Sequence, residues 1–97
     1  MAQVSIERQS DGSFAVEVGE RDAGTVHVVT VPKGVAARLG CDHVPPEDLV
    51  RAAFEFLLER EPPTSILRRF SISDITGYFP EFPREIRMRL GAGADGG

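Results

Sequence analysis

Residues 49–58 constrain the fold of this chain more than any other segment, because almost every side chain in them is apolar. Just before them, residues 45–48 (PPED) offer an early proline and two acidic side chains, which favour the first turn of a helix. Prolines 62–63 prevent a helix from continuing beyond about Glu61. The sequence therefore predicts one long helix over about 46–61.

The polar side chains of this helix follow one narrow stripe. They are Asp48, Arg51, Glu55 and Glu59. An ordinary amphipathic helix buries a single apolar face, but here all other positions from Leu49 to Leu58 are apolar. We therefore expect structure on two sides of the helix, with a sheet on one side and a further segment on the other.

Three segments before the helix alternate apolar and polar side chains or are rich in β-branched residues. They are residues 3–8, 14–20 and 25–31. Glycine-containing turn signals at 10–13 and 21–24 separate them. This pattern predicts a three-stranded antiparallel meander over about 3–31. A short helix is expected over 33–39, ended by Gly40.

The third predicted strand has valines on both faces. Val26 and Val28 lie on one face, and Val29 and Val31 lie on the other. Apolar residues on both faces are typical of a strand that is covered on both sides. Two alternatives stay open for the second cover: the C-terminal segment, or another subunit in a homodimer.

Short helices are expected to close the fold over about 64–90. Thr64 is a candidate N-cap for a helix over 65–70, and Ser73 is a candidate N-cap for a helix that begins at Asp74. A third helix over 83–90 has proline and glutamate early and arginines late. The remaining residues 91–97 (GAGADGG) are expected to be a disordered tail. Residues 1–90 are then a single α+β domain.

The segment 71–82 (SISDITGYFPEF) gathers aromatic and aliphatic side chains between prolines. One interpretation is that it folds over the far side of the long helix and completes the core. The other is that it forms an exposed docking surface. The candidate interaction surface consists of Arg68, Arg69, Tyr78, Phe79 and Phe82.

Charge argues against some partners. The chain of 97 residues has a net charge of −4, which repels a phosphate backbone, so nucleic-acid binding is not favoured. The first 61 residues carry six basic and eleven acidic side chains. Five later arginines either form a local basic surface or pair with the acidic helix stripe. They are Arg68, Arg69, Arg84, Arg87 and Arg89.

Few side chains suggest catalysis. A thiol, a carboxylate and an imidazole cluster only at Cys41-Asp42-His43, which offers too few ligands for zinc. With a single cysteine no internal disulfide can form, and His27 is expected to be a partly buried, hydrogen-bonded side chain. No phosphate-binding or hydrolase motif is present. We therefore expect no enzyme activity, no cofactor and no metal.

Two segments resemble known groups of proteins. Residues 25–40 (TVHVVTVPKGVAARLG) resemble the strand and first helix of ribbon-helix-helix repressors, with 45–60 as the second helix. That resemblance implies a DNA-binding or antitoxin-like regulator whose strands pair across a dimer, although the strand positions that would face DNA offer Val, His and Thr. Residues 54–82 are similar to a group of small uncharacterised bacterial proteins that share FEFLLEREP, SIL and YFPEF. That similarity implies no activity.

The expected class is therefore a small bacterial protein of the α+β type that acts as a non-enzymatic interaction or regulatory module. Ten arginines against one lysine, with abundant Ala, Gly and Pro, are typical of high-GC bacterial coding. No segment of about 20 apolar residues predicts a membrane span, and the N-terminus lacks the apolar core of a signal peptide. A cytoplasmic location and a protein partner, still unidentified, are the expectations.

Overall fold

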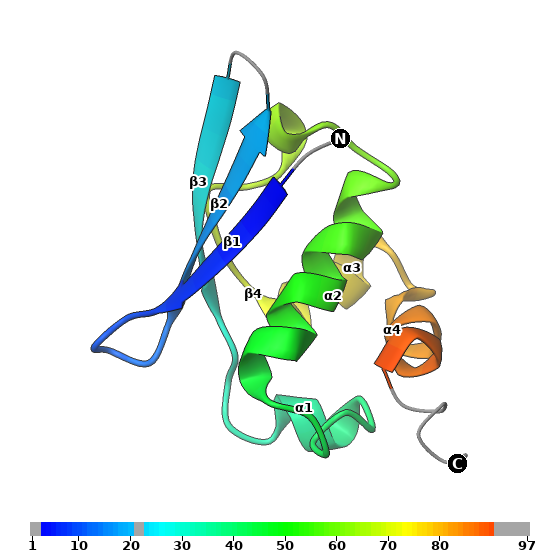
Figure 1. Ribbon diagram of the computed structural model, residues 1–97. Coiled ribbons are helices and arrows are strands. Elements are labelled where there is room, and N and C mark those ends of the chain that lie inside the picture. The colour runs from blue at the N-terminus through cyan, green and yellow to red at the C-terminus, as the bar shows by residue number, and fades with distance from the viewer. Residues whose placement is uncertain (1–2, 21–22, 91–97) are drawn as a thin grey trace.

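The computed structural model describes residues 3–20 and 23–90 of the chain. Its strands are β1 (Gln3–Arg8), β2 (Phe14–Glu20), β3 (Ala23–Thr30) and β4 (Arg69–Ser71). Its helices are α1 (Val35–Arg38), α2 (Pro46–Leu58), the short 3₁₀ helix η1 (Pro63–Ser65), α3 (Ile72–Tyr78) and α4 (Phe82–Leu90). The sheet packs on α2, and α4 packs on the side of α2 away from the sheet (Figure 1). The α+β class is confirmed.

The sheet has the strand order β1-β2-β3-β4. Its first three strands are antiparallel neighbours, as the alternating segments predicted. The fourth strand was not expected, because β4 runs parallel to β3 and aligns Phe70 with Val29. The predicted helix over 65–70 is therefore wrong.

Local geometry explains why residues 65–70 are not helical. The chain makes a single 3₁₀ turn after Pro62, and Ile66 is already extended, with φ −83° and ψ 136°. The extended chain reaches the open edge of β3, where the Arg68 carbonyl accepts a hydrogen bond from the Val28 amide at 2.7 Å. Pairing with β3 satisfies the backbone hydrogen-bonding groups of this segment. The spacing of Ile66 and Phe70 in the sequence gives no sign of this pairing.

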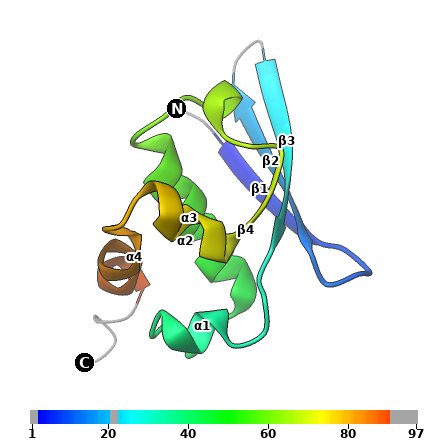
Figure 2. The same ribbon diagram turned by 180° about the vertical axis from the view of Figure 1, so that it is seen from behind.

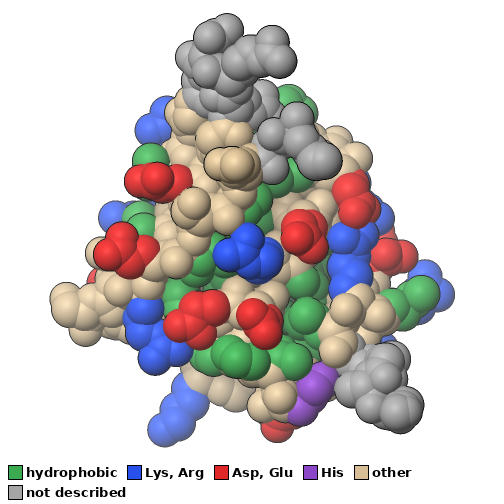
Figure 3. Space-filling view, viewed as in Figure 1, with side chains coloured by type: hydrophobic (Ala, Val, Ile, Leu, Met, Phe, Trp, Pro, Cys, Tyr) green, Lys and Arg blue, Asp and Glu red, His purple; other side chains and the backbone are tan. Residues whose placement is uncertain are grey.

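The long helix α2 is buried on two sides, as its sequence predicted. On the sheet side, the centroid of the Phe54 ring lies 5.3 Å from that of the His27 ring and 5.8 Å from that of the Phe70 ring. On the opposite side, Phe56 packs against Phe79 at 5.7 Å and Phe82 at 5.1 Å, both edge-on. The polar stripe of α2 remains exposed, although Arg51 donates to the Val4 carbonyl at 2.8 Å and Glu59 accepts from Arg89. Figure 3 shows acidic and basic side chains mixed on the face of the molecule seen in Figure 1.

The second face of the sheet is not covered by the C-terminal segment. Val26 is 50% exposed on that face, and the helices lie together on the other face (Figures 1 and 2). The C-terminal segment covers α2 instead. The prediction that this segment covers the second face of β3 is therefore wrong. Cover by another subunit stays a prediction.

The helix boundaries follow the predicted signals with three changes. Helix α2 ends at Leu58 and not near Glu61, because the chain already turns at Glu59 and Arg60 before it reaches Pro62. The first helix is shorter than expected, because Gly34 adopts φ 85° and the helix begins only at Val35. The N-cap of α3 is Ser71 and not Ser73: its hydroxyl accepts a hydrogen bond from the Ser73 amide at 3.1 Å, and Asp74 accepts one from the Ser71 amide at 3.0 Å. The predicted tail over 91–97 lies outside the described residues.

Among the helices described, none combines the length and the apolar character that crossing a bilayer requires.

Candidate functional site

A small apolar groove opens between the end of α2, the η1 turn, β4 and α3. Its volume is about 140 Å³. It is lined by Leu57, Glu61, Ser65, Ile66, Leu67, Phe70, Asp74, Ile75, Tyr78 and Phe79. The elements that form it lie together on the side of the molecule seen in Figure 2. Pockets for small-molecule ligands usually measure about 300–1,000 Å³, so this groove suits a single side chain better than a cofactor.

Core residues form the floor of the groove. Ile66, Phe70 and Ile75 are almost fully buried and belong to the hydrophobic core. The capping box at Ser71 starts α3 at the position that presents Ile75 to the floor. The floor is therefore pre-formed, because the same contacts that stabilise the domain also shape it.

The rim of the groove carries exposed apolar side chains. Leu67 is 51% exposed and Tyr78 is 67% exposed. Within residues 3–20 and 23–90 four large hydrophobic side chains are this exposed, and two of the four line this groove. Isolated exposed apolar residues need no explanation, but a cluster beside a groove is typical of an interaction site.

The charged side chains that line the groove are both acidic. Asp74 is engaged by the α3 cap, where it accepts the Ser71 amide hydrogen bond. Glu61 forms no ion pair within 4.0 Å in the described part of the chain. The groove is thus an apolar recess with a negatively charged rim, which favours a cationic group beside an inserted apolar one.

A buried histidine holds the rim in place. His27 is fully buried on the inner face of β3. Its Nδ1 donates to the Leu67 carbonyl at 2.7 Å, and its Nε2 accepts from the Thr25 hydroxyl at 2.9 Å. This side chain therefore ties the segment before β4 to the sheet.

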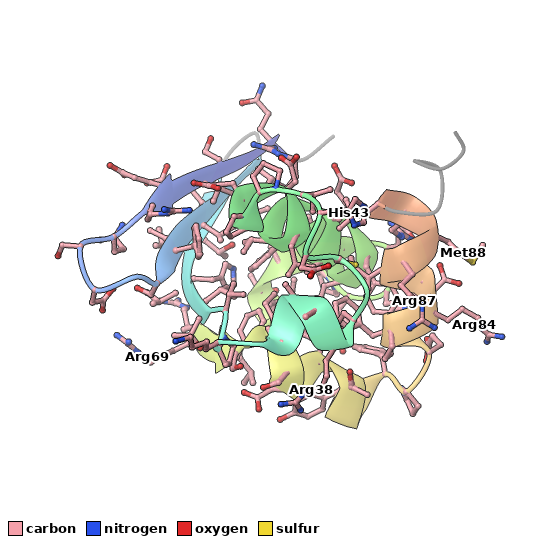
Figure 4. All side chains as sticks on the ribbon, turned by 90° about the horizontal axis from the view of Figure 1, so that it is seen from below. Arg38, His43, Arg69, Arg84, Arg87 and Met88 are labelled. Carbon is pink, nitrogen blue, oxygen red and sulfur yellow. The ribbon has the colours of Figure 1, made fainter. Side chains whose placement is uncertain are left out.

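The predicted interaction residues do not form one surface. Tyr78 and Phe79 line the groove, whereas Phe82, the first residue of α4, is fully buried against Phe56 of α2. Arg68 and Arg69 are exposed, and Arg69 flanks the inward-facing Phe70 on the open side of the sheet. Figure 4 shows Arg69 far from Arg84 and Arg87. The five C-terminal arginines therefore do not make a single basic surface.

Sequence reasoning missed most of the groove-lining residues. Leu57, Ile66 and Phe70 were assigned to core and helix positions, and the groove forms only because the segment after Pro63 is extended rather than helical. No local signal distinguished an extended segment from a helix after Pro62-Pro63, because a proline pair also stands at the start of α2. Glu61 on that elbow carried no distinguishing pattern.

The far side of α2 is closed by aromatic rings and arginines. The Arg60 guanidinium stacks 3.8 Å from the Phe56 ring centroid and pairs with Glu81 at 3.3 Å. Arg89 donates from both terminal nitrogens to Glu59 at 2.6 and 2.9 Å. Arg89 thus pairs with the acidic stripe of α2, which was one of the two alternatives for the C-terminal arginines. Hydrogen bonding from Arg89 lowers the pKa of Glu59.

The Cys41-Asp42-His43 cluster does not converge. Cys41 is buried, its thiol donates to the Leu39 carbonyl at 3.5 Å, and burial raises its pKa. His43 is exposed and donates to the Leu90 carbonyl at 3.3 Å. Among residues 3–20 and 23–90, no three His, Cys, Asp or Glu side chains are grouped as metal ligands.

The strand that resembles a ribbon-helix-helix strand lies inside the sheet of a single chain. β3 pairs with β2 along its length and with β4 at Val28, Val29 and Thr30. In a ribbon-helix-helix repressor the corresponding strand pairs with a second chain. This arrangement therefore gives the DNA-binding alternative no support.

Comparison of the chain with protein-family profiles, with curated proteins and with solved structures finds no significant match.

Proposed function

We propose that this protein is a non-enzymatic interaction module whose groove receives an apolar side chain of a protein partner. The observation that carries the proposal is the coincidence of a pre-formed apolar recess with two of the most exposed hydrophobic side chains, Leu67 and Tyr78. A cavity of about 150 Å³ holds a benzene ring, so the volume of about 140 Å³ matches one anchoring side chain.

The charged side chains of the groove favour particular residues beside the inserted apolar side chain of the partner. The lining contains Glu61 and Asp74 and no basic side chain, so an apolar residue next to Lys or Arg is the preferred sequence. Electrostatic complementarity of this kind selects the partner more than it raises affinity. The domain then acts as a receptor for short basic-apolar segments of other proteins.

A selection from a random peptide library tests the proposal. Peptides selected on the immobilised full chain should carry Leu, Met or Phe beside Lys or Arg. Their affinity should fall about tenfold or more with Glu61→Arg, since a reversed rim charge costs of order 1.4 kcal/mol or more. Glu17→Arg, which reverses an exposed charge on the open sheet face, is the matched control. Equal binding of the selected peptides to both variants would contradict the proposal.

A further inference from the structure

An exposed apolar side chain also lies on the outer surface of α4. Met88 is 65% exposed, while Phe82 and Ile86 on the same helix are fully buried. Arg87 and Met88 follow Arg84 by three and four residues, which places both of them beside Arg84 on one helical face. Figure 4 shows these three side chains spreading outward from α4, away from the sheet. We call this set the α4 knob.

The arginines of the α4 knob are available for a partner. Neither Arg84 nor Arg87 forms an ion pair within 4.0 Å in the described ranges, in contrast to Arg89. The aliphatic part of the Arg87 side chain packs against Gly40, because a Cβ atom added at Gly40 would lie only 2.9 Å from the Arg87 Cδ. Arg84 is exposed, so it is the cation with more freedom to meet an external carboxylate.

The α4 knob has the chemistry that the groove requires. It offers one flexible apolar side chain flanked by cations, and the groove offers an apolar floor, the aromatic rings of Tyr78 and Phe79, and the carboxylate of Glu61. Methionine fills irregular recesses well and makes favourable sulfur contacts with aromatic rings. Apolar fit and opposite charge therefore agree.

We propose that the groove of one copy receives Met88 of a second copy, with Arg84 of that second copy facing Glu61. This inference rests on the proposed function of the groove and names its occupant. Met88 does not line the groove of its own chain, so the contact joins two molecules. Because groove and knob are different surfaces, the contact is heterologous. In a pair, one copy keeps a free knob and the other keeps a free groove, and each can bind a further copy.

Such a contact is small, so association is weak and grows with concentration. Stable interfaces bury about 1,200–2,000 Å² in total, and one helix face on one groove falls at or below that range. Sedimentation velocity of the full chain from micromolar to millimolar concentration should show a weight-average mass that rises beyond a dimer. Met88→Glu and Glu61→Arg should each weaken association about tenfold to a hundredfold, as expected when one large apolar side chain or a charge pair is lost.

A mixing experiment tests the heterologous geometry. The Met88→Glu chain keeps its groove and the Glu61→Arg chain keeps its knob, so together they can make one productive contact. The mixture should form a 1:1 complex that does not grow further, although neither variant associates alone. Val26→Glu changes an exposed apolar side chain on the sheet, 50% exposed against 65% for Met88, and is the matched control. Cooperative unfolding of each variant verifies that it is folded.

Three outcomes overturn the inference. They are a wild-type chain that stays monomeric at the highest concentration, a mixture that remains monomeric, and association that is lost with Val26→Glu but kept with Met88→Glu. The last outcome would place the interface on the open sheet face. If the wild type is monomeric while library peptides bind in a Glu61-dependent way, the second copy is excluded as the occupant and the proposed function of the groove stands.

Discussion

At the scale of single residues, Phe56 holds the second layer of the fold in place. Its ring contacts Phe79 and Phe82 edge-on and lies under the Arg60 guanidinium. These contacts join α2 to the segment before α4 and to α4 itself. Tyr78 is an aromatic residue of the same region, but it is 67% exposed. Burial, not residue type, therefore decides how much each ring stabilises the domain.

Phe56→Ala should lower the free energy of unfolding by about 3–5 kcal/mol, the usual cost of emptying a buried aromatic site. Tyr78→Ala is the matched control and should change it by less than about 0.5 kcal/mol. Denaturant titration of both variants measures the difference. Similar effects from the two substitutions would mean that the far side of α2 is not closed by Phe56.

The pair of Glu59 and Arg89 should make stability depend on acid pH. Hydrogen bonding from Arg89 lowers the pKa of Glu59 below its ordinary value of 4.5 in the folded chain. A lowered folded pKa means that the stabilisation is complete above the unfolded value and is lost as pH falls through the folded value. Glu59→Gln should therefore destabilise the chain at neutral pH and have little effect in acid.

Chemical denaturation at a series of pH values from neutral to acid measures this dependence. Glu17→Gln, which changes an exposed carboxylate on the open sheet face, is the control and should run parallel to the wild type. A constant difference between Glu59→Gln and the wild type across the whole series would show that the loss is not linked to protonation of Glu59.

At the scale of elements, α3 depends on its first residues. It has only seven residues, and a helix of that length is marginal without capping and packing. The Ser71 hydroxyl and the Asp74 carboxylate together satisfy two backbone amides at its start. Because Ile75 and Tyr78 on α3 line the groove, the same cap that stabilises this helix also shapes the candidate site.

Ser71→Ala should cost about 0.5–2 kcal/mol, the usual effect of removing an N-cap side chain. Ser73→Ala is the control. It retains the backbone amide that donates to the Ser71 hydroxyl and removes only the exposed hydrogen bond between the two hydroxyls at 2.8 Å, so a change within about 0.5 kcal/mol is expected. Thermal unfolding of the two variants compares them directly. A larger loss with Ser73→Ala would reverse the assignment of the N-cap.

At the scale of the whole molecule, the N-terminal strands and the C-terminal helix α4 both pack on α2. Strands from the first thirty residues cover one side of this helix, and α4 covers the other (Figure 1). β4 adds to this arrangement because it comes from the C-terminal third and yet joins the N-terminal sheet. We therefore expect the domain to unfold as one cooperative unit, because neither half has a complete core.

Truncation after Glu61 should abolish cooperative thermal unfolding. The fragment lacks β4, α3 and α4, so Phe54 loses Phe70, and Phe56 loses Phe79 and Phe82. Truncation after Leu90 is the control and should melt like the full chain. A soluble 1–61 fragment with unchanged melting would show that the C-terminal third is a docking surface and not part of the core.

Sequence pattern predicted the elements whose burial is periodic. Alternating side chains identified β1 and β2, and the apolar run between prolines identified α2, each to within a few residues. A strand buries every second side chain and a helix buries side chains at its own period, so each type leaves a recognisable spacing in the sequence. The groove could not be predicted in this way. Its lining combines Leu57 of α2, Ile66 from the segment after η1 and Ile75 of α3, and no single segment of the sequence records their meeting.

The sequence by itself determined that α2 needs cover on two sides, because its apolar positions exceed what one sheet can bury. Only the tertiary structure decided how the cover is made. Residues 65–70 have apolar spacing that fits a helix, yet the unpaired edge of β3 offered backbone partners, and strand pairing satisfied them. Local propensity is a weak preference beside such long-range pairing. Hence the fourth strand, and the groove beside it, exist only in the folded chain.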